Sequence, residues 1–108
     1  MSALKKARPM LDYLVKSSLA TSKAILKTIS HEEVQLFGEI CSNLLAGAIK
    51  ISTANKTLLA DHAEVIRKLA RREIKPGTRQ RLLIKNSEAV VILIKTLYSK
   101  LYPKNGGT

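Results

Sequence analysis

A cluster of cationic side chains between residues 67 and 85 is the part of this sequence best suited to chemistry. Eight Lys and Arg residues stand there against one acid, Glu73. They are Arg67, Lys68, Arg71, Arg72, Lys75, Arg79, Arg81 and Lys85. Five of the eight are arginines, whose planar guanidinium group binds phosphate through two parallel hydrogen bonds. The cluster predicts a surface that binds a polyanion, and the charge alone does not distinguish DNA from RNA.

A solvated helix face with intrahelical ion pairs is the alternative interpretation of this cluster. Glu64 is spaced to pair with Lys68 one helical turn later. Exposed pairs of this kind contribute only about 0.3–0.5 kcal/mol each, and they cannot neutralise so many cations. The Lys-Pro-Gly-Thr turn at 75–78 also begins a helix, whose free N–H groups attract phosphate. We therefore favour polyanion binding.

Residues suited to catalysis or metal binding are few, and their spacing fits neither role. Cys41 and His62 fall among apolar positions of helical patterns, so we interpret both as core residues. His31 belongs to a helix start. These three residues lack the spacing of metal ligands, and the sequence has no Gly-rich phosphate loop. We expect no enzymatic activity, no catalytic residue, no metal site, no cofactor and no small-molecule substrate.

The overall charge agrees with a polyanionic partner. The 108 residues include 19 Lys and Arg against 8 Asp and Glu, which gives a net charge of +11 at pH 7. A compact domain with this charge repels itself, and a polyanion relieves that repulsion. Basicity that only aids solubility is the alternative. The single cysteine rules out an intrachain disulfide and fits an intracellular, reducing compartment.

Helices are the elements that we expect to position these cations. Hydrophobic residues make up 45% of the chain but aromatic residues only 4%, which favours an aliphatic, helical core. We predict an all-α fold, a compact array of five or six short helices. Residues 1–8 are predicted to form a basic arm, residues 9–102 one helical domain and residues 103–108 a flexible tail. Lys5, Lys6 and Arg8 of the arm are auxiliary candidates for nucleic-acid binding.

Local signals predict where the helices begin and end. The strongest is Ser30-His31-Glu32-Glu33, a capping box in which Ser30 and Glu33 bond each other's free backbone N–H groups. Gly47 is expected to close that helix in a left-handed conformation. The other predicted helices start at Pro9, at residue 23 after a Ser22 cap, near Ser52 or Thr53, at residue 79 after Thr78, and at residue 89.

The helix predicted from residue 53 to about 72 is the one that orients most of the cationic cluster. Its apolar stripe consists of Leu58, Leu59, His62, Val65, Ile66, Leu69 and Ala70. The opposite face would then present Arg67, Lys68, Arg71 and Arg72 as a continuous cationic surface. Pro76-Gly77 is a firm stop, and a short helix over 79–85 follows.

The apolar segment 89–102 is predicted to be the last helix. A strand is the alternative, but no partner strand is found elsewhere, and the spacing Leu93–Leu97–Leu101 is helical. Its apolar run, residues 89–94, is far shorter than the roughly 20 residues that span a bilayer, and we expect no membrane partner. The residues Val90, Val91, Ile94 and Leu97 belong either to the core or to a surface for self-association.

Residues 40–83 contain three short motifs in a characteristic order. They are Cys41-Ser42-Asn43-Leu44-Leu45-Ala46-Gly47, then Val65-Ile66-Arg67-Lys68-Leu69-Ala70, and finally Gly77-Thr78-Arg79-Gln80-Arg81-Leu82-Leu83. This order resembles a small basic protein of Polinton/Maverick-type elements and adintovirus-like DNA viruses, with its "N-L-L-x-G", "L-R-x-L-A" and "R-x-L-L" motifs. That family often continues with Gly-Gly-Phe, whereas this chain has Lys85-Asn86-Ser87-Glu88, and it tends to carry more Lys between the first two motifs.

The resemblance implies a viral core protein that accompanies a double-stranded DNA genome in the nucleus or virion, similar in role to adenoviral core proteins. Our leading hypothesis is thus a DNA-binding architectural or genome-condensing protein with weak sequence dependence; a helix-turn-helix is a variant of it. One alternative is a helical interaction module, such as a minor capsid or scaffold protein, that binds an acidic protein. A second, which we favour least, is a peripheral membrane binder.

Overall fold

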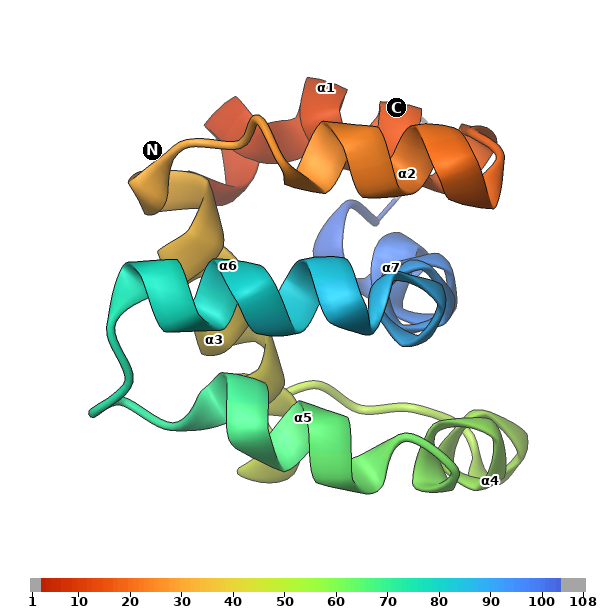
Figure 1. The fold of residues 1–108 in the computed structure, drawn as a ribbon. Coiled ribbons are helices and arrows are strands. Elements are labelled where there is room, and N and C mark those ends of the chain that lie inside the picture. Colours follow the sequence, from red (N-terminus) through yellow and green to blue (C-terminus); the bar gives the residue numbers. More distant parts are fainter. Residues whose placement is uncertain (1–2, 104–108) are drawn as a thin grey trace.

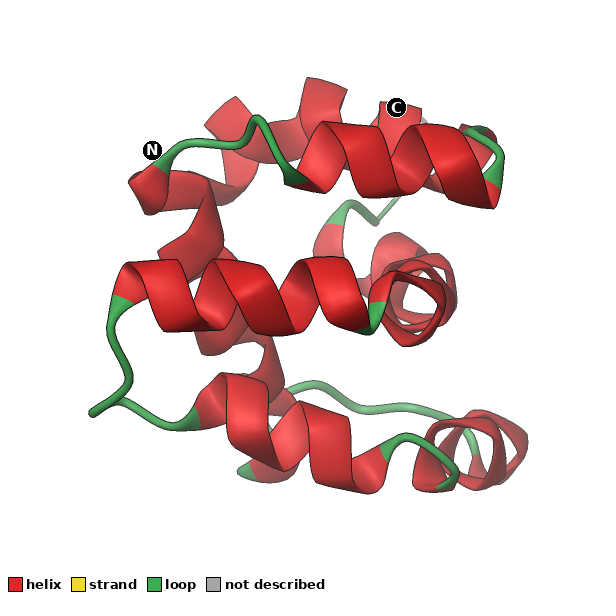
Figure 2. Cartoon of the chain, in the orientation of Figure 1, coloured by secondary structure: helices red, strands yellow, loops and turns green. Residues whose placement is uncertain are grey.

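The computed structural model describes residues 3–103, and every regular element in that range is a helix (Figures 1 and 2). The helices are α1 (Ala3–Lys16), α2 (Leu19–Leu26), α3 (His31–Leu45), α4 (Thr53–Ala60), α5 (Ala63–Ala70), α6 (Pro76–Lys85) and α7 (Ser87–Leu101). The all-α prediction is confirmed. The described range holds seven helices instead of five or six, because the single helix predicted over 53–72 is two helices.

A turn at Asp61-His62 divides α4 from α5. His62 has φ −116° and ψ 16°, outside helical geometry, and its N–H bonds the carbonyl of Leu59 at 2.9 Å. The bend lets Leu59 and Leu69, at the two ends of the segment, both reach the interior of a small domain. His62 is only half-buried in the turn, so its interpretation as a core residue is wrong.

The helices are arranged around α3 and α7 (Figure 1). α2, α6 and α5 lie above one another in a front layer, and α3 crosses behind α6 and α5. α7 and α4 run across this layer and are seen nearly end-on, while α1 lies behind α2. α5 and α6 are antiparallel, so the cations of both helices and of their connecting loop belong to one hairpin.

The core is aliphatic and surrounds the one phenylalanine, Phe37, which is fully buried. α7 contributes many of the core residues, since it is covered by α1, α2 and α6. The segment is helical, as predicted, and its apolar character on several sides reflects these several neighbours. Of the two alternatives left open for this helix, the core is the one observed, because the four residues considered for self-association are at most 9% exposed: Val90, Val91, Ile94 and Leu97.

Residues 1–8 were predicted to form a basic arm, but residues 3–8 form the beginning of α1. Two tyrosines at the C-terminal end of α7, Tyr98 and the C-cap Tyr102, hold this helix in place. The Tyr98 hydroxyl donates to the Asp12 carboxylate, and the Tyr102 hydroxyl donates to the Leu4 carbonyl. These contacts, together with the burial of Ala7, stabilise a helix that contains Pro9. Of the predicted tail, residues 104–108 lie outside the described residues.

The start of α2 also differs from the prediction. Ser18 caps this helix, and its side chain accepts a hydrogen bond from the Thr21 N–H at 3.2 Å. Ser22, the predicted cap, is buried and donates from Oγ to the Leu14 carbonyl at 3.2 Å. It thereby adds a second donor to a carbonyl near the C-terminal end of α1, which also accepts from the Ser17 N–H at 3.4 Å.

Both predicted signals of α3 are confirmed. The Ser30–Glu33 capping box is present, with distances of 2.9 and 3.1 Å. Gly47 has φ +81°. Its N–H bonds the Leu44 carbonyl at 3.1 Å, and the Ala48 N–H bonds the Asn43 carbonyl at 2.9 Å. This pair of bonds is a Schellman motif, which turns the chain sharply away from the helix axis.

Burial of Cys41 in α3 gives a prediction about its reactivity. Removal from water raises the pKa of the thiol from 9.0 to about 12. Only the thiolate attacks disulfide reagents, so at about pH 8 the folded protein should react on the order of 10³-fold more slowly than the unfolded chain. Absorbance with Ellman's reagent, with and without guanidinium chloride, measures this difference. Rapid reaction of the folded protein would show that Cys41 is exposed.

Candidate nucleic-acid interface

The helix α5 is amphipathic, with one buried apolar face and one exposed cationic face. Ile66 and Leu69 are buried and pack toward α3, which is the principal neighbour of α5. Arg67 and Lys68 are exposed on the other side. The helix was predicted to continue to about residue 72, but it ends at Ala70. Its cationic face is therefore shorter than predicted.

Arg71 and Arg72 therefore belong to the loop 71–75 and not to a helix face. Arg71 is extended, with φ −65° and ψ 127°. The loop leaves Arg71, Arg72 and Lys75 exposed. It then enters α6 at Pro76, whose fixed φ suits the first helical position. These cations are exposed as expected, but a loop and not a helix presents Arg71 and Arg72.

Arg79 departs most from the sequence prediction, because it is only 7% exposed. Its Nε donates to the Leu69 carbonyl at 3.0 Å, and its Nη2 donates to the Arg71 carbonyl. Carbonyls at a helix C-terminus lack intrahelical partners and carry the negative end of the helix dipole. The Arg79 guanidinium satisfies both needs at the end of α5. Arg79 is therefore not an exposed phosphate-binding residue; it anchors the loop.

Gly38 of α3 makes room for this guanidinium group. A Cβ at Gly38 would lie 2.8 Å from Nε and 2.9 Å from Cζ of Arg79, closer than such atoms can approach. Gly38 was not among the residues predicted from the sequence to belong to the site. A glycine in the middle of a helical pattern is the signal that could have found it, since it costs helix stability unless something packs closely there.

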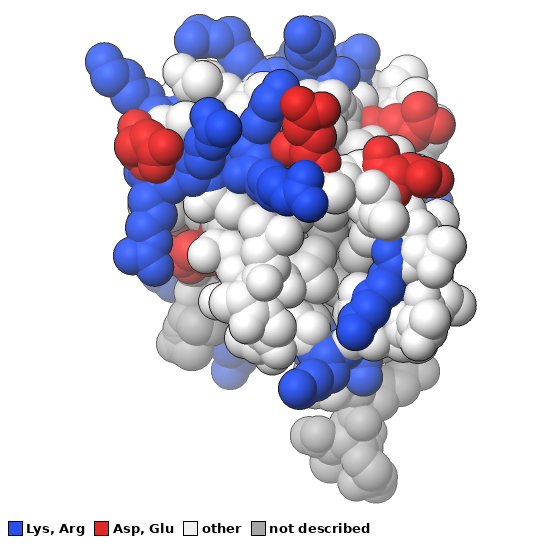
Figure 3. Space-filling model, turned by 90° about the horizontal axis from the view of Figure 1, so that it is seen from below, with Lys and Arg blue, Asp and Glu red and all other residues white. Residues whose placement is uncertain are grey.

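The exposed cations of α5, loop 71–75 and α6 form one surface, which we call the basic hairpin. Its members are Arg67, Lys68, Arg71, Arg72, Lys75, Arg81 and Lys85. Lys68 lies 3.9 Å from Glu64, and Arg81 Nη2 lies 3.5 Å from the Thr78 hydroxyl. The other five make no ion pair or side-chain hydrogen bond to another described residue. Figure 3, a view onto the α4–α5 end, shows Lys and Arg side chains gathered along one border of that face, with Asp and Glu side chains among them.

Two further features lie beside the basic hairpin. The N-cap of α6, Lys75, makes no side-chain capping bond, which leaves the N–H groups of Gly77 and Thr78 without a side-chain cap. A polar hollow of about 650 Å³ also opens between α3 and the loop. Gln35, Glu39, Ser42, Asn43 and Arg72 are among the residues that line it, and of these only Arg72 was predicted from the sequence to be a site residue.

The auxiliary cations of α1 are not part of this surface. Lys5, Lys6 and Arg8 are exposed, but Figure 1 places α1 at the opposite end of the molecule from α5. The Arg8 guanidinium lies 5.0 Å from the centre of the Tyr102 ring. Partial burial raises the pKa of that tyrosine to about 12.

No protein-family model, curated protein or solved structure matches this chain. The resemblance to Polinton-type proteins therefore stays a prediction. Within residues 3–103, no group of three or more His, Cys, Asp and Glu residues could hold a metal ion. No helix in that range is long and apolar enough to cross a membrane.

Proposed function

We propose that this chain is a non-enzymatic protein that binds nucleic acid, with duplex DNA favoured, through the phosphates at its basic hairpin. One observation carries the proposal: seven exposed cations share an antiparallel helix pair, and a buried arginine anchors the loop between the helices. Six of them have no anionic partner among the described residues, so a polyanion is the partner that fits this surface.

The anchored loop gives the proposed site its rigidity. Because Arg79 donates to the carbonyls of Leu69 and Arg71, it holds the backbone of the loop that carries Arg71 and Arg72 in one conformation. Less conformational freedom is then lost when they meet phosphates. The uncapped N–H groups of α6, the Asn43 amide and the Ser42 hydroxyl can donate to the sugar–phosphate backbone, whereas the Gln35 amide already donates to Glu39. Such contacts position a duplex without reading its sequence.

The biological role and the compartment that we propose follow from the resemblance to Polinton-type proteins. If the chain is a relative of the Polinton-type basic proteins, its role is that of a genome-condensing or architectural core protein in the nucleus or virion. Binding to an acidic protein, as an interaction or scaffold module, is the second candidate function. An apolar groove at the α4–α5 end of the molecule supports that second function.

A salt titration of DNA binding tests the proposal. Neutralised phosphates release condensed counterions, so the logarithm of affinity should fall linearly with the logarithm of salt concentration, by about 0.9 per phosphate contacted. If five or six of the cations engage, the slope should be roughly −4 to −6. Mobility shifts of a short duplex over a salt series measure the slope, with RNA and heparin as competitors.

A pair of double variants separates the basic hairpin from total charge. Arg71→Ala with Arg72→Ala, and Lys16→Ala with Lys23→Ala, each remove two exposed cations and lower the net charge from +11 to +9. We expect the first pair to flatten the slope by about one to two and to weaken all sequences alike. The second pair should have much less effect. Equal losses, a slope near zero, or strong preference for one short sequence would refute the proposal.

A further inference from the structure

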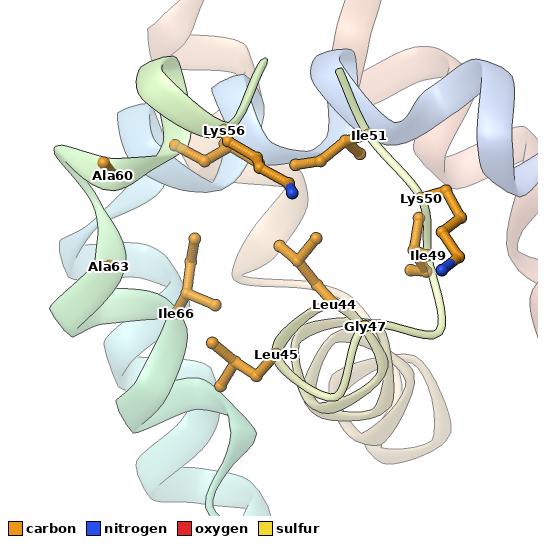
Figure 4. Close-up of a pocket in the computed structure, with 11 residues that line it drawn as sticks. Leu44, Leu45, Gly47, Ile49, Lys50, Ile51, Lys56, Ala60, Ala63 and Ile66 are labelled. Carbon is orange, nitrogen blue, oxygen red and sulfur yellow. The ribbon is translucent and has the colours of Figure 1, made fainter. Parts of the chain in front are cut away.

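An apolar groove lies on the α4–α5 end of the molecule, apart from the loop that carries Arg71 and Arg72. Its volume is about 360 Å³ (Figure 4). The end of α3, the segment 47–51, α4 and α5 all contribute to it. Its apolar lining consists of Leu44, Leu45, Gly47, Ile49, Ile51, Leu59, Ala60, Ala63 and Ile66.

The sequence explains why this groove stays open. The Schellman motif at Gly47 turns the chain away from α3, and a segment without helix leads across to α4. α4 is short, and Leu59 is its one buried residue. Helices on either side therefore do not close over Leu45, which remains 50% exposed. In Figure 3, an uncharged area occupies the centre of this face. Exposed apolar hollows of this kind mark binding sites.

Charge at the groove indicates what fits there. Its charged lining residues, Lys50 and Lys56, are both cationic, and no acidic residue is among those that line it. Figure 4 shows the Lys56 side chain extending across the groove and the Lys50 amine beside Ile49. A fitting occupant combines apolar side chains with carboxylates. A second copy of this chain, at +11, fits poorly, and nucleic acid has no aliphatic side chains to insert.

We propose that this groove binds a short, acidic, amphipathic helix of a partner protein. Apolar residues at positions i, i+3, i+4 and i+7 of such a helix would insert between Leu44, Ile51 and Ile66, as in other helix-in-groove complexes. Flanking carboxylates would meet the two lysines. The carbon chains of those lysines extend the apolar wall while their amines reach the rim. The groove shares α5 with the basic hairpin, but none of the hairpin's cations lines it.

Nuclear magnetic resonance with a designed peptide tests the proposal. The probe is a blocked helical peptide of about 16 residues, with leucine at i, i+3, i+4 and i+7 and glutamate at most other positions. A peptide of the same composition in scrambled order is its control. In about 0.15 M salt, we expect the first peptide to shift the signals of Leu44, Ile49 and Ile66. The scrambled peptide should bind at least about fivefold more weakly.

Two variants test the two parts of the groove. Lys50→Ala with Lys56→Ala should weaken the leucine peptide about five- to tenfold, whereas the equally charged Arg71→Ala, Arg72→Ala variant should change its affinity less than about twofold. Ala60→Trp fills the groove from an exposed position without changing charge. It should abolish peptide binding and leave duplex DNA binding intact, with circular dichroism confirming the fold.

Several outcomes would overturn the proposal. Equal affinity for the scrambled peptide, or shifts confined to the basic hairpin, would mean that charge alone attracts the peptide. Tighter binding of dodecanoate in the groove would identify a lipid-like ligand instead. A dimer in analytical ultracentrifugation that Ala60→Trp dissociates would identify a second copy of the chain.

Discussion

Replacement of Arg79 by Ala is expected to lower the free energy of unfolding by about 3 kcal/mol or more, since hydrogen bonds to charged groups contribute about 1.5–3 kcal/mol each. The variant would leave the carbonyls of Leu69 and Arg71 without their partner. Arg79→Met fills a similar volume without a donor and should lose nearly as much. Denaturant titration followed by circular dichroism measures both losses. A loss under about 0.5 kcal/mol, which is typical of a surface substitution, would place Arg79 on the surface after all.

Glycine substitutions give an independent test of the same contact. At an ordinary position inside a helix, Gly→Ala stabilises by up to about 1 kcal/mol. Gly38→Ala should instead destabilise by about 1–3 kcal/mol, because its Cβ would collide with the Arg79 guanidinium. Gly77→Ala in α6 is the matched control, since a Cβ there meets nothing within 4 Å. If both substitutions behaved alike, Arg79 would not pack against α3.

The second large effect concerns two leucines that sequence periodicity assigned to one stripe. Leu69→Ala should lower the free energy of unfolding by about 2–5 kcal/mol, as expected for a leucine buried in a core. Leu69 is 1% exposed, whereas Leu58 is 46% exposed. Leu58→Ala should therefore change stability by no more than about 0.5 kcal/mol. Thermal or denaturant unfolding of the two variants side by side provides the measurement. Equal losses of stability would instead support the predicted single helix over 53–72, with both leucines buried.

Local signals made the helical fold predictable, because their physics lies within a few residues. The capping box at Ser30 and Glu33 needs only one helical turn, and Gly47 needs only a position where φ is positive. The helical spacing of Leu93 and Leu97 likewise predicted α7 correctly. The cluster of cations was visible in the same way, since charge density is a property of composition.

Features that depend on distant contacts were not predictable. Helical spacing puts Arg79, but not Arg81, on the face of Leu82 and Leu83, yet nothing nearby in the sequence supplies the carbonyls that a buried guanidinium needs. Those carbonyls are left to be satisfied because α5 ends at Ala70. The extension of α1 to Ala3 depends on tyrosines far along the chain. The bend at His62 reflects the small radius of the domain. The spacing of apolar residues along the chain does not indicate that radius.

The bonds between α1 and α7 have a consequence for the order in which the protein folds. Tyr98 bonds a residue 86 positions earlier, and Tyr102 one 98 positions earlier. Closing so long a loop costs chain entropy, whereas each helix and the α5–α6 hairpin need only near neighbours. On the ribosome, α1 can meet α2 and α3 as soon as they form, but its bonds to Tyr98 and Tyr102 must wait until the end of α7 has been synthesised. Of the seven described helices, α1 is thus among the last to be fully secured, and the basic hairpin can be complete before it.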